Sequence, residues 1–290
     1  MRIAVTGASG FLGSAVVQRL RAAAHRVVAL NRATTGDIAA VLDWSAHMSD
    51  LDAVVHLAAL AHAPAGNEAR LRAVNVDAAV AIGHAAAAAG VRMLFMSSAK
   101  VFGEGTAGVP FNERSMLHPG NEYAYAKAMA EDGLRAIVGL RLTVLRPPLV
   151  YGPGVRGNFL TLFRAVAQGW PLPLAGIVNR RSLVSVCNLA DAVACCLESE
   201  RAEGKIYCVA DSAPVSTPEL CRAIGAALGH QARLFAFPPA LLELVPQARK
   251  LTRSLELDDG SVRRELGWSA PCLFDNELRR TADWFRDLGG

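Results

Sequence analysis

Three glycines near the start of the chain constrain its fold more than any other feature. The sequence opens MRIAVTGASGFLG, in which Gly7, Gly10 and Gly13 recur at every third position. The apolar run Ile3 to Val5 before them is typical of a buried strand, and the stretch Phe11 to Leu20 after them has the apolar periodicity of a helix. The glycines are therefore expected in a tight turn that joins a strand to a helix.

A turn of this kind can hold a phosphate group. A dinucleotide pyrophosphate needs backbone that approaches it without Cβ atoms, together with free amides at the positive end of a helix. The spacing is GxxGxxG rather than the GxGxxG of common Rossmann dehydrogenases, which indicates a different branch of dinucleotide-binding proteins. The alternative is a glycine-rich turn without a ligand. We predict a cofactor loop, with contacts from Gly7, Gly10, Phe11 and Leu12.

Composition limits what the chain can do. Its 290 residues are 52% hydrophobic and 19% charged, enough to bury a full core in one large domain or in one domain with a smaller lobe. No uncharged apolar stretch reaches the roughly 18 residues of a membrane span, and the first predicted strand leaves no room for a signal peptide. We therefore expect a cytoplasmic protein. The net charge of +4 is spread along the chain, so we expect no nucleic-acid partner.

The cysteines favour neither a metal site nor disulfides. No two of them form a CxxC pair, and most lie in apolar segments, as buried free thiols do. We therefore expect no metal and no redox chemistry at sulfur. The six cysteines are Cys187, Cys195, Cys196, Cys208, Cys221 and Cys272.

Strand-like and helix-like segments alternate up to about residue 150, as in a doubly wound parallel sheet. Only about 20 residues separate Asn31 from the strand in DAVVHLAA, so the third strand of such a sheet and its helix must be abbreviated. The predicted strands are Arg26 to Leu30, Ala53 to Leu57, Met93 to Ser97 and Leu140 to Arg146, and the predicted helices are Glu68 to Ala89 and Glu122 to Val138.

The alternation ends after Pro147. The segment RPPLVYGPG is expected to be a loop, and GWPLPLAGIVNRRS resembles a linker. Later elements are a helix at Asn158 to Gln168, a strand at Lys205 to Val209, a helix that STPEL opens, and a C-terminal helix at Asn276 to Asp287. The predicted fold is α/β, a Rossmann-type doubly wound parallel sheet with a smaller C-terminal substrate lobe. The predicted cofactor domain is 1–154 plus 179–203, and the lobe is 155–178 plus 204–290.

The end of the second predicted strand bears on the choice of cofactor. NAD sites carry an acidic residue there for the ribose hydroxyls, whereas an arginine suits the 2′-phosphate of NADP. This chain has Asn31 and Arg32, and a guanidinium can grip a phosphate with two hydrogen bonds. We therefore predict NADP, with NAD as the alternative. Asp37, followed by Ile38, is the next carboxylate and is expected at the adenine ring.

A tyrosine and a lysine in the middle of the chain suggest acid-base chemistry. In NEYAYAKAMAE, Tyr123 and Lys127 are four residues apart and share one face of the predicted helix. A neighbouring ammonium is expected to lower the pKa of the phenol toward neutrality, which suits proton exchange with a secondary alcohol during hydride transfer. Ser97 and Ser98 end the strand before this helix, at the edge of the sheet where ligands bind.

Together these motifs resemble those of the extended short-chain dehydrogenase/reductases, in the NAD-dependent epimerase/dehydratase group. They occur in the expected order over nearly the whole chain. The segments that carry the resemblance are TGASGFLG, HLAA from His56, Asn75 in AVNVDAA, SSAKVFGE, Tyr123 with Lys127, RPPLVYGPG, Asn158 in GNFL, and Arg181 in RRSLVSVCNLADAV.

The resemblance implies roles for individual residues. Ser98, Tyr123 and Lys127 are expected to be catalytic, with Lys127 also at the cofactor ribose. The expected cofactor contacts are His56 and Ala58 through their backbone, Asn75, and Pro147 near the nicotinamide. Asn158 and Arg181 are expected to hold the diphosphate of a UDP-sugar, beside Ser98, Lys100 and Tyr123 at the sugar. A homodimer through the two long predicted helices is also expected.

Several reactions of the group remain open. Dehydratases have an Asp-Glu pair after the catalytic Ser or Thr, whereas here Ala99 and Lys100 follow Ser98, which argues against water loss. The segments SSAKVFGE, LVYGPGVRGNF and NRRS are similar to those of bacterial UDP-glucose 4-epimerase-like enzymes. Some of these enzymes reduce UDP-4-keto-6-deoxy-N-acetylhexosamines in surface-polysaccharide synthesis. We predict such a 4-ketoreductase, with a UDP-hexose 4-epimerase as the alternative. A non-catalytic NADP-sensing protein is a further alternative, against which Ser98, Tyr123 and Lys127 argue.

Overall fold

A parallel sheet of six strands forms the centre of the protein in a computed structural model, which describes residues 1–41, 43–61, 67–211, 213–245 and 248–289. The strand order is β2-β1-β3-β4-β5-β8, and every neighbouring pair is parallel. The predicted α/β fold with a doubly wound sheet is confirmed. The strands are β1 (Arg2–Thr6), β2 (Arg26–Leu30), β3 (Ala53–His56), β4 (Arg92–Met96), β5 (Leu142–Arg146) and β8 (Ile206–Cys208).

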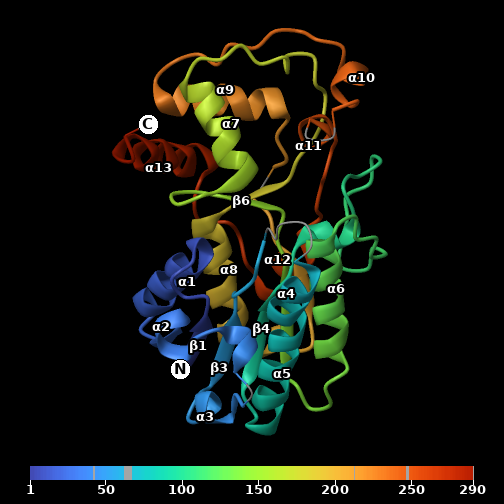
Figure 1. The fold of residues 1–290 in the computed structure, drawn as a ribbon. Helices are drawn as coiled ribbons and strands as arrows, with labels where there is room; N and C mark the ends of the chain where they lie inside the picture. Colours follow the sequence, from blue (N-terminus) through green and yellow to red (C-terminus); the bar gives the residue numbers. More distant parts are fainter. Residues whose placement is uncertain (42, 62–66, 212, 246–247, 290) are drawn as a thin grey trace.

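Helices cover both faces of this sheet (Figure 1). On one face, α1 (Phe11–Ala22) and α8 (Val186–Glu198) share a buried core with β1 and β3. On the other face, α3 (Ser45–Met48), α5 (Ala78–Ala88) and α6 (Glu122–Arg135) pack on the same strands around a second core. Because both faces are buried, the strands are apolar runs without strict alternation.

The connection from β2 to β3 is short, as predicted. It contains α2 (Arg32–Thr35), the 3₁₀ turn η1 (Ile38–Ala40) and α3, and its described residues form no strand. The sheet therefore ends at β2, and these short turns form the wall beside its carboxyl end.

The long helix predicted from Glu68 to Ala89 is interrupted. The chain forms α4 (Glu68–Arg72), then a five-residue π-helix η2 (Ala73–Asp77), then α5. Propensity could not show this break, because Ala-rich sequence favours an unbroken helix. The buried Asn75 lies in the π-turn, and its side chain exchanges hydrogen bonds of 2.8 and 3.0 Å with the backbone of Leu60. The irregular turn thus holds the segment that follows β3.

Two predictions after Pro147 were wrong. The presumed loop contains β6 (Leu149–Tyr151), which pairs in parallel with β7 (Leu183–Ser185). The boundary after residue 203 also needs correction, since β8 completes the large sheet instead of joining the lobe. The three residues of β6 are too few to show a period of two, so pattern alone could not reveal this strand. The strand at β8 was predicted, but its pairing with the distant β5 could not be read from local pattern.

The upper part of the molecule in Figure 1 is a helical lobe. It is built from α7 (Gly157–Ala167), α9 (Thr217–Leu228) and α13 (Phe274–Asp287), which share a third core. Ser216 and Glu219 form the capping box that STPEL suggested for α9. The remaining short elements are η3 (Ala99–Phe102), η4 (Glu200–Ala202), α10 (Pro239–Leu242), α11 (Arg249–Thr252) and α12 (Gly260–Leu266).

A buried ion pair joins α6 to β5 behind the edge of the sheet. The Arg146 guanidinium lies 2.5 Å from the carboxylate of Glu131, and both side chains are at least 97% buried. Ser97 donates a short hydrogen bond to the same carboxylate. Two charges buried this deeply depend on each other, because either one left alone would lack solvation.

Removing one member of this pair is expected to destabilise the fold strongly. Glu131→Gln leaves the Arg146 charge buried without its counter-ion, so the free energy of unfolding should fall by about 3–5 kcal/mol. Urea denaturation followed by circular dichroism measures the change. The double variant Glu131→Leu with Arg146→Met should recover most of the loss, and a single variant within about 1 kcal/mol of wild type would contradict the assignment.

Candidate active site

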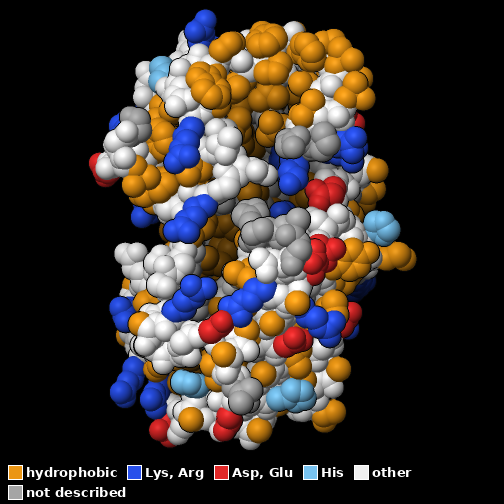
Figure 2. Space-filling model, in the orientation of Figure 1, with side chains coloured by type: hydrophobic (Ala, Val, Ile, Leu, Met, Phe, Trp, Pro, Cys, Tyr) orange, Lys and Arg blue, Asp and Glu red, His pale blue; other side chains and the backbone are white. Residues whose placement is uncertain are grey.

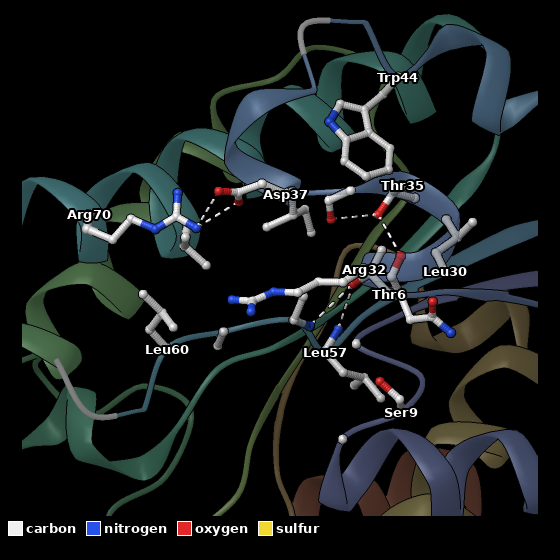
Figure 3. Close-up of a pocket in the computed structure, with 18 residues that line it drawn as sticks. Thr6, Ser9, Leu30, Arg32, Thr35, Asp37, Trp44, Leu57, Leu60 and Arg70 are labelled. Atoms are coloured by element: carbon white, nitrogen blue, oxygen red, sulfur yellow. Dashed lines mark hydrogen bonds and ion pairs between the residues drawn. The ribbon is translucent and has the colours of Figure 1, made fainter.

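A pocket opens at the carboxyl end of β1, β2 and β3, where the predicted cofactor loop lies (Figure 3). The turn after β1 forms one side, and the short turns after β2 form the opposite side. Of the predicted cofactor residues, Gly7, Gly10, Asn31, Arg32, Asp37, Ile38 and Ala58 line it. The other lining residues are Thr6, Ser9, Leu30, Thr35, Gly36, Trp44, Leu57, Ala59, Leu60, Arg70 and Val74.

The glycine turn fits a dinucleotide pyrophosphate. Gly7 has a φ of +68°, and a Cβ there would lie 2.9 Å from the backbone nitrogen of Ala58. A Cβ on Gly13 would lie 2.0 Å from the carbonyl oxygen of Gly7. Gly10, the residue before α1, offers no side chain to the first-turn amides, so these donors remain for a phosphate. Gly7 and Gly13 are therefore required by close backbone contact.

The adenosine end of the pocket contains two arginines. Figure 3 shows Arg32 reaching into the pocket toward the side where Asp37 and Arg70 lie. Arg70 forms an ion pair of 2.6 Å with Asp37, and its hydrogen bond lowers the pKa of that carboxyl. Among the described residues, the Arg32 guanidinium has no hydrogen bond or ion pair. The side chain of Asn31 is engaged within its own turn, because its oxygen accepts the amide of Ala33 and so caps α2.

A hydroxyl group ties the ends of β1 and β3 together beneath this pocket. Thr6 Oγ1 accepts the amides of Leu57 and Ala58 at 3.2 and 3.3 Å, so its proton is left for His56 Nδ1, 2.9 Å away. His56 is completely buried, and burial lowers its pKa to about 3. The imidazole is therefore neutral and supports the β3 turn from below.

Several other expected cofactor residues do not line the pocket by their side chains. His56 is beneath it, Asn75 is engaged with Leu60, and Phe11 and Leu12 begin α1 beside it. Pro147 is buried, and its carbonyl accepts the amide of Ala99 at 2.8 Å. Their proposed roles in cofactor binding rest on the resemblance and stay predictions.

The three expected catalytic residues come from adjoining elements. Ser98 follows β4 and precedes η3, while Tyr123 and Lys127 lie on one face of α6. Ser98 and Tyr123 line the pocket that is expected to bind the substrate, whereas Lys127 is buried behind them and donates to the carbonyl of Met96 at 2.7 Å. Tyr125 is 54% exposed and faces away, as its spacing predicted.

The expected effect of Lys127 on the tyrosine is absent from this structure. Burial raises the pKa of Tyr123 to about 12, and Lys127 makes no contribution to that shift. Burial also lowers the pKa of Lys127 to about 7, although Glu131 opposes the shift. The spacing of four residues brings both groups to one helix face, but the lysine ammonium turns to a backbone carbonyl. At neutral pH the phenol is therefore protonated.

A second pocket lies between the sheet edge and the helical lobe. All five expected substrate residues line it, although they come from distant segments. Figure 2 shows a hollow between the two parts of the molecule, with Lys and Arg side chains beside it. The five residues are Ser98, Lys100, Tyr123, Asn158 and Arg181.

The substrate pocket is rich in positive charge. Arg181 and Lys100 are joined there by Arg156 and Lys250, and Glu104 is the one carboxylate among the described lining residues. The ammonium of Lys100 lies 5.6 Å from the centre of the Tyr123 ring. Burial, followed by the charge of Lys250, lowers the pKa of Lys100. Lys100 therefore faces the pocket and is not a solvated surface lysine.

Sequence reasoning missed several residues of both pockets. Trp44 precedes the short helix α3 and Arg70 lies in the short helix α4, and no motif marks either residue. Arg156 lies inside the quoted segment LVYGPGVRGNF, next to the predicted Asn158, so its position carried a usable signal. Lys250 reaches the site from α11, about 70 residues from Arg181, and nothing in the sequence links the two.

The sheet, the glycine turn and the Ser-Tyr-Lys set at its edge define an extended short-chain dehydrogenase/reductase. Residues 3–210 match the model of the NAD-dependent epimerase/dehydratase family. The chain is 33% identical to a UDP-glucose 4-epimerase of Vibrio cholerae, over 98% of this chain and 95% of that protein. The protein therefore belongs to the NAD-dependent epimerase/dehydratase family, and the expectation of an enzyme of this family is confirmed.

Two further similarities fall within the same group. A GDP-6-deoxy-D-mannose reductase of Pseudomonas aeruginosa is 32% identical over 55% of each chain. The structure of MoeE5 in complex with UDP-glucuronic acid and NAD has a TM-score of 0.82 and 25% identity, and covers 99% of this chain and all of that one. None of the helices in the described ranges is long and apolar enough to cross a membrane.

The buried imidazole of His56 predicts how the free energy of unfolding depends on pH. Its pKa is lower in the folded than in the unfolded protein, so between about pH 3 and pH 6.5 the unfolded chain binds more protons. Stability should therefore rise with pH in this window, and from neutral pH to pH 5 His56 should account for a loss of about 2 kcal/mol.

Urea denaturation at several pH values tests this expectation. His56→Gln should lose that part of the acid sensitivity, whereas His84→Gln, at an exposed position on α5, should keep it. Identical pH dependence in wild type and His56→Gln would show that the imidazole is not held neutral.

Proposed function

We propose that this protein transfers a hydride at C4 of a UDP-sugar, in the direction that reduces a 4-ketone. The proposed substrate is a UDP-4-keto-6-deoxy-hexosamine and the proposed cofactor is NADPH. The observation that carries the proposal is that Ser98, Tyr123, Asn158 and Arg181 line one pocket, although they come from both parts of the fold. A 4-ketoreductase is consistent with surface-polysaccharide synthesis.

A nicotinamide cofactor held by the glycine turn would supply the hydride. In the proposed reaction the hydride goes to carbon C4, and the ketone oxygen takes a proton from the hydroxyl of Tyr123. Ser98 donates a hydrogen bond to the same oxygen as negative charge develops on it. The phenol of Tyr123, protonated at neutral pH, has the proton that the reduction of a ketone requires.

Lys127 is the proposed partner of both tyrosine and cofactor. Its ammonium donates a hydrogen bond to the carbonyl of Met96, the last residue of β4, two residues before Ser98. With a pKa near 7, the lysine can exchange a proton at working pH and so help to reprotonate Tyr123. Its expected contact with the cofactor ribose comes from the resemblance.

The positive side chains of the substrate pocket suit a nucleoside diphosphate. Arg181 presents a planar fork that matches phosphate oxygens, and burial lowers its pKa without removing its charge at neutral pH. Its NH1 group donates to the carbonyl of Arg253 at 2.9 Å, which fixes the side chain. Lys100, nearer to Tyr123, is proposed to contact the sugar.

NADP is proposed on the basis of Arg32. This guanidinium faces the cofactor pocket without a partner among the described residues, and no acidic side chain takes the ribose position at Asn31. Asp37 is held by Arg70 and is left to the adenine ring. A charge-assisted pair with a 2′-phosphate would satisfy Arg32.

A UDP-hexose 4-epimerase is the second candidate, favoured by the similarity to the enzyme from Vibrio cholerae. The same residues would act twice, first oxidising C4 and then returning the hydride to the opposite face. Such an enzyme keeps its nicotinamide nucleotide bound between turnovers. The two candidates therefore differ in cofactor consumption.

Cofactor content and consumption test the proposal. Purified protein should contain little bound nucleotide and should oxidise NADPH in equal amount to an added UDP-4-keto-6-deoxy-hexosamine, as followed by the absorbance of the reduced nicotinamide. Tyr123→Phe should slow this reaction about 10²- to 10⁴-fold. Tightly bound NAD, with interconversion of UDP-hexose epimers and no net consumption, would contradict the reductase and favour the epimerase.

A substitution at Arg32 tests cofactor choice separately. Arg32→Gln removes the guanidinium, so the preference for NADPH over NADH in kcat/KM should fall about 10- to 100-fold. Arg26→Gln, exposed at the other end of β2, is the matched control and should leave the preference unchanged. An unchanged preference in Arg32→Gln would remove this residue from the phosphate site.

We also propose a homodimer through α4, α5 and α6. The outward face of α6 exposes Tyr125 and Met129, four residues apart, at 54% and 42%. Two apolar side chains on one exposed helix face suit contact with a second copy. Gel filtration at working concentration should give twice the chain mass of 30.7 kDa, and a monomer would contradict the proposal.

A further inference from the structure

Two cysteines and a glutamate meet away from both pockets, where the lobe joins the large sheet. Cys187 is the second residue of α8, Cys272 precedes α13, and Glu277 is on the first turns of α13. One ligand atom from each lies within 4.8 Å of the other two. In the described part of the chain, this is the one group of three metal-ligating side chains so close together.

One oxygen of this group is buried without a partner. Glu277 is 2% exposed, and among the described residues its Oε2 has no hydrogen-bond partner. Its other oxygen accepts a hydrogen bond of 2.9 Å from Arg280. A buried carboxylate oxygen without a hydrogen-bond donor is costly. A cation bound to Oε2 would remove this cost.

The backbone around the group is already fixed. The Asn188 side chain accepts the amide of Cys272 at 2.8 Å and donates to its carbonyl at 3.0 Å, which holds this segment against α8. Both cysteines are half-buried and free of disulfides. Both sulfur atoms are therefore available as ligands, and partial exposure allows water to reach them.

We propose that Cys187, Cys272 and Glu277 bind one divalent, thiolate-seeking metal ion, of which Zn²⁺ is the commonest in proteins. Tetrahedral Zn²⁺ with bonds of about 2.3 Å to sulfur and 2.0–2.2 Å to oxygen places two sulfur ligands about 3.8 Å apart. The three ligand atoms lie within 4.8 Å of one another, so small side-chain movements would bring them to this geometry. Water supplies the fourth ligand.

The charges of the group balance around such an ion. Two thiolates and one carboxylate carry three negative charges, and a divalent ion with the guanidinium of Arg280 carries three positive ones. Arg280 keeps its bond to Oε1 and leaves Oε2 for the metal.

The ion would fasten the lobe to the cofactor domain. Cys187 belongs to α8, which packs on the large sheet, and Glu277 belongs to α13, which packs in the core of the lobe. A bond between them crosses the boundary on the side opposite α6 in Figure 1. The site is therefore structural, and it revises the expectation from sequence that the cysteines bind no metal.

Cobalt titration of the reduced, metal-free protein tests the proposal without reference to activity. Wild type should take up one Co²⁺ per chain with a thiolate charge-transfer band, and Zn²⁺ should displace it. Cys187→Ser and Cys272→Ser should lose the band, while Cys195→Ser, half-buried on the same helix, should keep it. Glu277→Gln should bind roughly tenfold or more weakly.

Thermal denaturation gives a second readout. Zn²⁺ should raise the Tm of wild type and of Cys195→Ser, but not that of Cys187→Ser. Glu277→Gln nearly preserves the shape of the side chain, so this variant should fold. A smaller rise of its Tm with Zn²⁺ would then report weaker metal binding and not misfolding. Absence of metal uptake by wild type, uptake that survives Cys187→Ser, or a Cys187–Cys272 disulfide in place of uptake would each overturn the proposal.

Discussion

The close approach of two backbone turns at the carboxyl edge of the sheet determines the rest of the site. The turn after β1 and the turn after β3 touch so tightly that Gly7 cannot carry a side chain, and Gly13 is excluded from carrying one by the backbone of Gly7 and Ala8 in the β1 turn itself. The hydroxyl of Thr6 then joins them, because it accepts two amides from the β3 turn and donates to the buried His56. The pocket for a dinucleotide is the space left above this contact.

The proposed catalytic residues depend on the same edge of the sheet, at the next strand, β4. β4 ends beside β3, so Ser98 emerges next to the cofactor pocket, and α6 brings Tyr123 to the same place. The buried pair of Glu131 and Arg146 ties α6 to β5 beneath them. The lobe then closes the opposite side with Asn158 and Lys250. The proposed chemistry therefore needs both parts of the molecule.

The sequence predicted the features that local chemistry dictates. The glycine spacing, the apolar runs and the Tyr123–Lys127 interval each encode a local geometry, and the sheet, the turn and the shared helix face followed from them. The pocket residues that only tertiary packing brings to the site were not predictable. Arg70 and Lys250 reach their pockets from segments without a motif, and β8 joins the sheet by a pairing far along the chain. The state of Tyr123 also escaped prediction, because it depends on burial and on the direction in which Lys127 points.

The most direct test is to follow the hydride itself. Reduction of a UDP-4-keto sugar with NADPH that carries deuterium at the transferable position should place one deuterium at C4 of the product, as mass spectrometry and NMR would show. Tyr123→Phe should give almost no labelled product in the same time. A product that carries no deuterium at C4 would contradict hydride transfer from NADPH, and so would product that forms while the amount of added NADPH stays unchanged.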